Sequence, residues 1–207
     1  MISPGPVTRD LLTTYDDVCS RILARLDGLT DAEYLWEPVP SCMTLRASTD
    51  GTGTGTFRAD PRPARDVVPA PFTTIAWRIW HIGADCLRGY GRFFEDDSEG
   101  EDRDLWPGTA AAGIRMLADD ALRFRARVAA LGDDGLLRPM GPRAGVYGQE
   151  SYLLLALHAL DEVAHHGAEL GVLRDLYLYG GSLHGGFSGQ ATNPDEAGVT
   201  TRRPPAS

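Results

Sequence analysis

The chain has 207 residues, of which 43% are hydrophobic, and this is enough for one domain with a sizeable core. Its longest apolar runs are far shorter than the roughly 20 residues that a helix needs to cross a bilayer, so we expect no membrane span. Twenty basic residues against 29 acidic ones give a net charge of −9, which disfavours nucleic acid as a partner. We therefore expect a soluble, cytoplasmic protein.

The basic residues and the cysteines exclude several kinds of chemistry. Every basic residue is arginine, so lysine-based Schiff-base and phosphate-loop mechanisms are excluded. The three cysteines, Cys19, Cys42 and Cys86, are an odd number without C-x-x-C spacing, which argues against a disulfide framework or a cysteine zinc site. Cys86 falls on an apolar helix face, where we expect it to pack in the core.

The first part of the chain contains one long helix, one short helix and a loop. Apolar residues recur at three- and four-residue steps over 7–29, which is typical of an amphipathic helix. Thr30 and Glu33 form a capping box that predicts a short helix. Residues 41–71 are rich in Thr, Gly, Pro and Arg and lack a helical period. They are predicted to form a long crossover loop with at most a short pair of strands.

Three more long helices are predicted in the remainder of the chain. The second long helix covers 72–94. The third runs from Pro107, placed as a first-turn proline, to Leu131, where Gly132 ends it and a short helical piece follows. The fourth covers about 147–178.

Four long helices with little strand pattern predict an all-α four-helix bundle. The long connection between the first two helices predicts a crossover instead of a simple hairpin. We place the bundle in residues 1–178, where the fourth helix is expected to stop at Gly180 and Gly181. Residues 179–207, rich in Gly, Thr, Pro and Asn, are predicted to be a flexible tail.

The fourth helix carries a stripe of ionisable side chains. At 100° per residue, five of them share one side of the helix: His158, Asp161, Glu162, His165 and Glu169. Asp161 with His165 is an i, i+4 pair that can aim a carboxylate and an imidazole at one cation, and Glu162 with His166 is a second such pair. Periodicity alone favours the solvated face of an amphipathic helix, but no arginine occurs on this helix between residues 147 and 173.

The second helix contains one histidine, His81. It lies on the minority polar face, four residues before Asp85. Taken alone, His81 is better explained as a partly exposed residue paired with Asp85 than as a metal ligand. A role for His81 as a metal ligand requires that another helix supplies further ligands.

Segments 72–83 and 161–177 together resemble the corresponding helices of the DinB-like superfamily, also called DinB/YfiT-like, which includes the mycothiol-dependent maleylpyruvate isomerases. Residues 29–38 are similar to the region after the first helix of that family, so the resemblance covers most of 7–178. The two helical segments in this order are fairly specific, whereas neither is so alone. The resemblance implies a four-helix bundle with a divalent metal, commonly zinc or nickel, at one end.

The resemblance also implies a set of site residues. His81 matches the histidine ligand of the second helix, and His165 matches a histidine ligand of the fourth. The third ligand position falls on Asp161, where many members have histidine and the maleylpyruvate isomerases have glutamate. Because aspartate has a shorter reach, the pair Glu162 and His166 stays open as an alternative. His158, one turn before Asp161, is the candidate acid or base, although it also fits a plain polar residue.

The function that the resemblance implies is a metal-dependent S-transferase or detoxification enzyme. The metal would activate a low-molecular-weight thiol of the mycothiol type, which attacks a small-molecule electrophile. A non-catalytic, stress-related bundle protein and a metal-dependent hydrolase are the two alternatives. A homodimer through helix faces is the expected assembly for this family.

Overall fold

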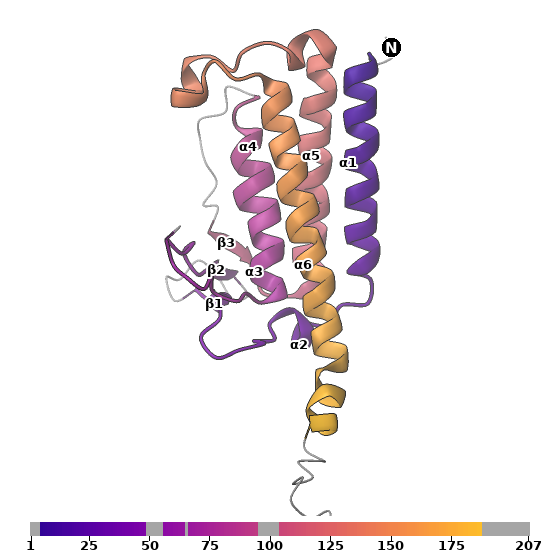
Figure 1. The fold of residues 1–207 in the computed structure, drawn as a ribbon, viewed down its shortest axis with the longest axis vertical. Coiled ribbons are helices and arrows are strands. Elements are labelled where there is room, and N and C mark those ends of the chain that lie inside the picture. The colour runs from indigo at the N-terminus through magenta and orange to yellow at the C-terminus, as the bar shows by residue number, and fades with distance from the viewer. Residues whose placement is uncertain (1–4, 49–55, 65, 95–103, 188–207) are drawn as a thin grey trace, which may run out of the picture.

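A computed structural model describes residues 5–48, 56–64, 66–94 and 104–187. Most of the described chain is helical, and a small sheet lies at one end of the long helices (Figure 1). Helix α1 (Pro6–Arg25) packs against both α5 (Ala110–Leu136) and α6 (Tyr152–Phe187). The predicted helical class is therefore confirmed, with a sheet added to it.

The second long helical segment changes its winding along its length. It starts as the α-helix α3 (Ile75–Trp80), continues as the π-helix η1 (His81–Arg88) and ends with α4 (Gly89–Gly91). The π-helical part packs against α5 and α6. No periodicity in the sequence indicated the change of winding.

The second segment begins later than the sequence predicted. Thr74 caps α3, because its hydroxyl accepts a hydrogen bond from the backbone N–H of Trp77 at 3.1 Å. The residues before the cap are held in an extended conformation: the N–H of Met43 donates to the carbonyl of Phe72, and the N–H of Thr74 donates to the carbonyl of Met43. These backbone bonds prevent Phe72 from joining the helix.

Three short strands form an antiparallel sheet in the order β1-β2-β3: β1 (Leu45–Ala47), β2 (Thr56–Ala59) and β3 (Leu105–Pro107). The first two strands lie within 41–71, where the sequence predicted a long loop with at most a short pair of strands. Pro107, predicted in the first turn of a helix, instead ends β3, and α5 begins after Thr109. A proline is tolerated there because β3 is an edge strand.

The sheet packs against the helices through the side chain of Trp106 in β3. Its side chain is only 1% exposed, and it lies over Gly83 of the π-helix. A Cβ atom on Gly83 would come within 2.6 Å of the Cη2 atom of Trp106. The glycine thus permits a close contact between sheet and helix next to His81.

The shorter helices and their ends follow the sequence in part. Helix α2 (Asp31–Tyr34) begins at the predicted capping box, with the hydroxyl of Thr30 accepting from the N–H of Glu33. Gly132 interrupts α5 with a φ of 62°, as its position predicted. Helix α1 ends at Arg25, earlier than expected.

The last helix differs from the prediction at both ends. Residues 142–147 form the 3₁₀-helix η2 (Pro142–Tyr147), which contains Gly145 at a φ of 57°, so α6 begins only at Tyr152. The helix then continues through Gly180 and Gly181 to Phe187. The predicted flexible tail therefore starts within a helix, and its residues 188–207 lie outside the described part of the chain.

The core lies between the long helices and includes side chains from each of them. Its largest fully buried members are Trp106, Tyr34, Phe124, Leu26, Ile75, Ile79, Ile82, Leu87, Leu136 and Leu170.

Among the described residues, no helix combines the length and the apolar composition that crossing a membrane requires.

Candidate metal centre

The π-helix brings three functional side chains to one side of the second segment. A π-helix closes its hydrogen bonds between residues five apart, so residues four and five positions after His81 both lie near it. Nδ1 of His81 lies 3.0 Å from Oδ2 of Asp85, and Nε2 lies 3.6 Å from Sγ of Cys86. In a regular α-helix Cys86 would point about 140° away from His81. The unusual winding is thus what places a sulfur beside this imidazole.

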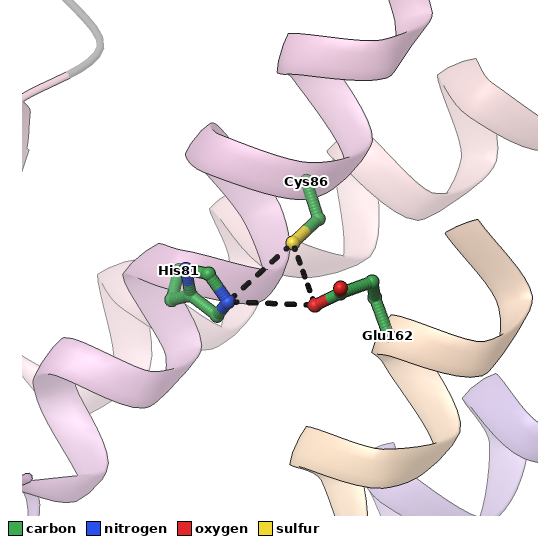
Figure 2. Close-up of side chains that lie close together, drawn as sticks. All are labelled: His81, Cys86 and Glu162. Atoms are coloured by element: carbon green, nitrogen blue, oxygen red, sulfur yellow. Dashed lines mark hydrogen bonds and ion pairs between the residues drawn. The ribbon is translucent and has the colours of Figure 1, made fainter. Parts of the chain in front are cut away.

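Helix α6 supplies the facing groups. Glu162 points at the π-helix, and its Oε2 atom lies 3.7 Å from Nε2 of His81 and 3.7 Å from Sγ of Cys86 (Figure 2). His166, one turn further on, places its Nε2 atom 3.2 Å from the same Oε2 atom. Two imidazoles and a thiol from two helices therefore approach one carboxylate oxygen.

The spacing of these atoms fits a bound cation. The sides of the triangle formed by His81 Nε2, Cys86 Sγ and Glu162 Oε2 are 3.6 to 3.7 Å long. The centre of such a triangle lies about 2.1 Å from each corner, and zinc binds nitrogen and oxygen at about 2.0 to 2.2 Å and sulfur at about 2.3 Å. Nitrogen, oxygen and sulfur donors together suit zinc and similar borderline cations.

Four side chains form one cluster: His81, Cys86, Glu162 and His166. Each of its two histidines is oriented by a carboxylate at its other ring nitrogen. Asp85 contacts Nδ1 of His81, and Oε2 of Glu169 lies 2.9 Å from Nδ1 of His166. When the two Nδ1 atoms carry the protons, both Nε2 atoms present lone pairs toward Glu162. Metal-binding histidines are held in this way in proteins generally.

Two arginines hold those carboxylates in turn. Nε of Arg62 lies 3.1 Å from Oδ2 of Asp85, and Nε of Arg78 lies 2.7 Å from Oε2 of Glu169. Partial burial by itself would raise the pKa of Glu169, but the hydrogen bond with His166 and the charge of Arg78 outweigh it and hold this pKa below its usual value. Glu169 thus stays an anion that can orient His166.

The thiol of Cys86 has the opposite electrostatic setting. Burial raises its pKa above the usual value, and the nearby charge of Glu162 raises it further. Without a cation the thiol stays protonated and donates a hydrogen bond to Glu162. A cation in the cluster would supply the positive charge that a thiolate needs.

The structure brings only one of the three predicted metal ligands into this cluster. His81 is buried there, whereas Asp161 is exposed and the side chain of His165 is 65% exposed. Two groups of metal-ligand atoms occur among the described residues; neither contains Asp161, and His165 belongs to the more exposed one, with His166 and Glu169. The geometry instead places Glu162 in the buried group, with His81 and Cys86, and His166 meets that group through its 3.2 Å contact with Glu162.

The predicted acid or base, His158, lies at the edge of the cluster. Its Nε2 atom is 3.7 Å from Oε1 of Glu162 and 3.1 Å from the hydroxyl of Tyr90, and its side chain is half exposed. His158 is thus next to the carboxylate that the other groups share and remains open to solvent.

Sequence reasoning missed the place of Cys86 in the cluster. The prediction that it is buried is right, because it is 2% exposed, but it faces polar atoms. In an α-helix, a cysteine five residues after His81 would lie on a different side of the helix, so the sequence did not indicate that the two side chains share a site. The contact of Arg78 with Glu169 was missed for a similar reason, since it depends on how two helices pack.

The described fold and site define a mainly helical protein with a candidate metal centre between two of its helices. A family model described as the DinB superfamily matches residues 14–170, and the chain belongs to this superfamily. The resemblance seen in the sequence is thereby confirmed at the level of the superfamily. Neither the curated proteins nor the solved structures contain a significant match to the chain.

Proposed function

We propose that the protein is a metal-dependent thiol S-transferase or detoxification enzyme on a DinB/YfiT-like four-helix bundle. His81, Glu162 and His166 bind one divalent cation, zinc or nickel. The observation that carries this proposal is the convergence of both Nε2 atoms on Oε2 of Glu162, at 3.7 and 3.2 Å, while both Nδ1 atoms face carboxylates. This replaces Asp161 and His165 in the ligand set implied by resemblance.

The chemistry follows from the groups around that oxygen. When bound, such a cation acts as a Lewis acid and lowers the pKa of a thiol or of water toward neutrality. The low-molecular-weight thiol, of the mycothiol type, approaches from the side of His158, which is the more exposed edge of the cluster. We assign to the imidazole of His158 the acceptance of the thiol proton, and to Tyr90 the orientation of that ring through the 3.1 Å contact of its hydroxyl with Nε2.

Two pairs of neighbouring residues on α6 provide matched variants for a direct test. His166→Ala removes a cluster imidazole, whereas His165→Ala removes the exposed imidazole next to it. Glu162→Gln and Asp161→Asn form the corresponding carboxylate pair. Each protein is purified under zinc- and nickel-replete conditions, and its metal content is measured by elemental analysis.

We expect one metal ion per chain in the unmodified protein, and loss of it in His166→Ala, Glu162→Gln and His81→Ala. His165→Ala and Asp161→Asn should keep the metal. The reverse pattern would restore the ligand set implied by resemblance, and a metal-free protein would favour a non-catalytic bundle. Consumption of mycothiol in the presence of an electrophile distinguishes the transferase from a hydrolase that uses water at the same centre.

A further inference from the structure

One of the three cysteines in the chain lies within the cluster, and the proposed function gives it no task. Sγ of Cys86 is 3.6 Å from Nε2 of His81 and 3.7 Å from Oε2 of Glu162. These are the separations of two donors on one tetrahedral cation, which are about 3.3 to 3.7 Å for zinc. The hydrogen bond between a thiol and a carboxylate explains one of the two contacts but not the equal approach of the imidazole nitrogen.

The winding of the second segment supports a role for this sulfur. A π-helix is rare and occurs frequently at functional sites. Here it turns Cys86 from the apolar side of the helix, where an α-helix would put it, toward His81 and α6 (Figure 2). The same winding keeps Asp85 on Nδ1 of His81, so both nitrogens of the imidazole are in use.

We propose that Cys86 is itself a metal ligand and completes a four-donor set with His81, Glu162 and His166. This inference rests on the proposed function, because it concerns the same cation. A thiolate donor selects zinc or cobalt over magnesium or manganese. Four protein donors also leave a tetrahedral cation without an open position for water.

A closed donor set favours a thiol over water as the incoming group. A thiol could replace the sulfur of Cys86 one for one, and the proton that His158 accepts from the thiol would then pass to the released Cys86 sulfur, so that charge and atoms balance. Water would have to replace a soft donor with a hard one.

Cobalt(II) titration of the full chain tests the inference spectroscopically. Cobalt in a tetrahedral site gives visible d–d bands, and a thiolate ligand adds a near-ultraviolet sulfur-to-cobalt charge-transfer band. We expect both in the unmodified protein and in Cys42→Ser. Cys86→Ser should keep the d–d bands, lose the charge-transfer band and bind zinc at least about tenfold more weakly in a chelator competition.

The possible outcomes separate the two proposals. Cobalt binding without a charge-transfer band overturns the role of Cys86 and leaves the metal centre standing. Absence of cobalt binding overturns both proposals. If Cys86→Ser does not fold, the double variant Cys19→Ser/Cys42→Ser decides, because Cys86 is then the one cysteine left in the chain. A charge-transfer band in that variant supports the inference, and its absence contradicts it.

Discussion

His81 and His166 both direct Nε2 toward Oε2 of Glu162, because a carboxylate contacts Nδ1 on the far side of each ring. Asp85 and Glu169 come from different helices, yet each contacts Nδ1 of one imidazole. A free imidazole exchanges its proton between two nitrogens, and such a contact removes that freedom. The carboxylates thereby fix the lone pairs that a cation needs before any cation arrives.

Replacement of Asp85 by asparagine should weaken metal binding while every proposed ligand remains in place. The amide can hold Nδ1 of His81 less well and no longer strengthens the imidazole as a donor, so we expect a 10- to 100-fold loss of zinc affinity, roughly the usual effect of such partners. A chelator competition measures it. Asp17→Asn, at an exposed position of α1, is the control and should leave the affinity unchanged. Equal affinities in all three proteins would show that Asp85 does not orient the site.

For single residues, the sequence identified the polar stripe of the last helix but not which edge of that stripe faces the second helical segment. Measured from His158 at 100° per residue, Glu162 and His166 fall at about 40° and 80°, whereas Asp161 and His165 fall at about 300° and 340°. Both flanks belong to one stripe. Which flank faces the second segment depends on how α6 packs against η1, and one helix alone contains no information about that packing.

The π-helix η1 positions the candidate site. No pattern in the sequence predicted it. The apolar residues of this segment satisfy an α-helical period. The wider winding of the π-helix therefore leaves no trace in the sequence. Gly83 offers a partial explanation in retrospect, because Trp106 occupies the space that a side chain there would need. The helices and their caps could be predicted because their signals are local, as at Thr30 and Gly132.

Gly83→Ala should therefore destabilise the fold even though alanine is the better helix former. The added methyl group would lie 2.6 Å from Cη2 of Trp106 and 3.0 Å from Oδ2 of Asp120, and overpacking of this kind costs about 1 to 3 kcal/mol. Gly180→Ala is the matched control, since a Cβ there meets nothing within 4 Å. It should raise stability by up to about 1 kcal/mol. Urea unfolding midpoints measure both, and a Gly83→Ala protein as stable as Gly180→Ala would contradict the contact.

At the scale of the whole molecule, contacts between distant segments hold the ends of the helices together. Arg174 of α6 contacts Glu33 of α2 at 3.0 Å, and both side chains are largely buried. At the other end, Asp133 caps α1 from across the molecule, accepting hydrogen bonds from the backbone N–H groups of Val7 and Thr8 at 3.1 and 2.8 Å. Such pairings between sequence-distant residues could not be predicted, because they become neighbours only after the helices have packed.

The cap formed by Asp133 makes stability depend on pH in a defined direction. The first helix has Gly5 at its N-cap, which offers no side-chain acceptor, and a Cβ there would clash with the carboxyl group of Asp133. Hydrogen bonds from the hydroxyl and the N–H of Thr8 lower the pKa of Asp133 below its usual 3.8. A carboxylate with a lowered native pKa stabilises the fold fully above its unfolded pKa, and this contribution is lost as the pH falls through the native value.

Asp133→Asn should accordingly lower the free energy of unfolding most at neutral pH, and the difference from the unmodified protein should shrink as the pH falls below about 4. Urea unfolding at a series of pH values measures this difference. Asp134→Asn removes the same charge from the exposed neighbouring side chain and should change stability by no more than about 0.5 kcal/mol. A difference for Asp133→Asn that stayed constant down to pH 2 would mean that the charge of the carboxylate contributes nothing to the cap, and that only its shape holds the start of α1 against α5.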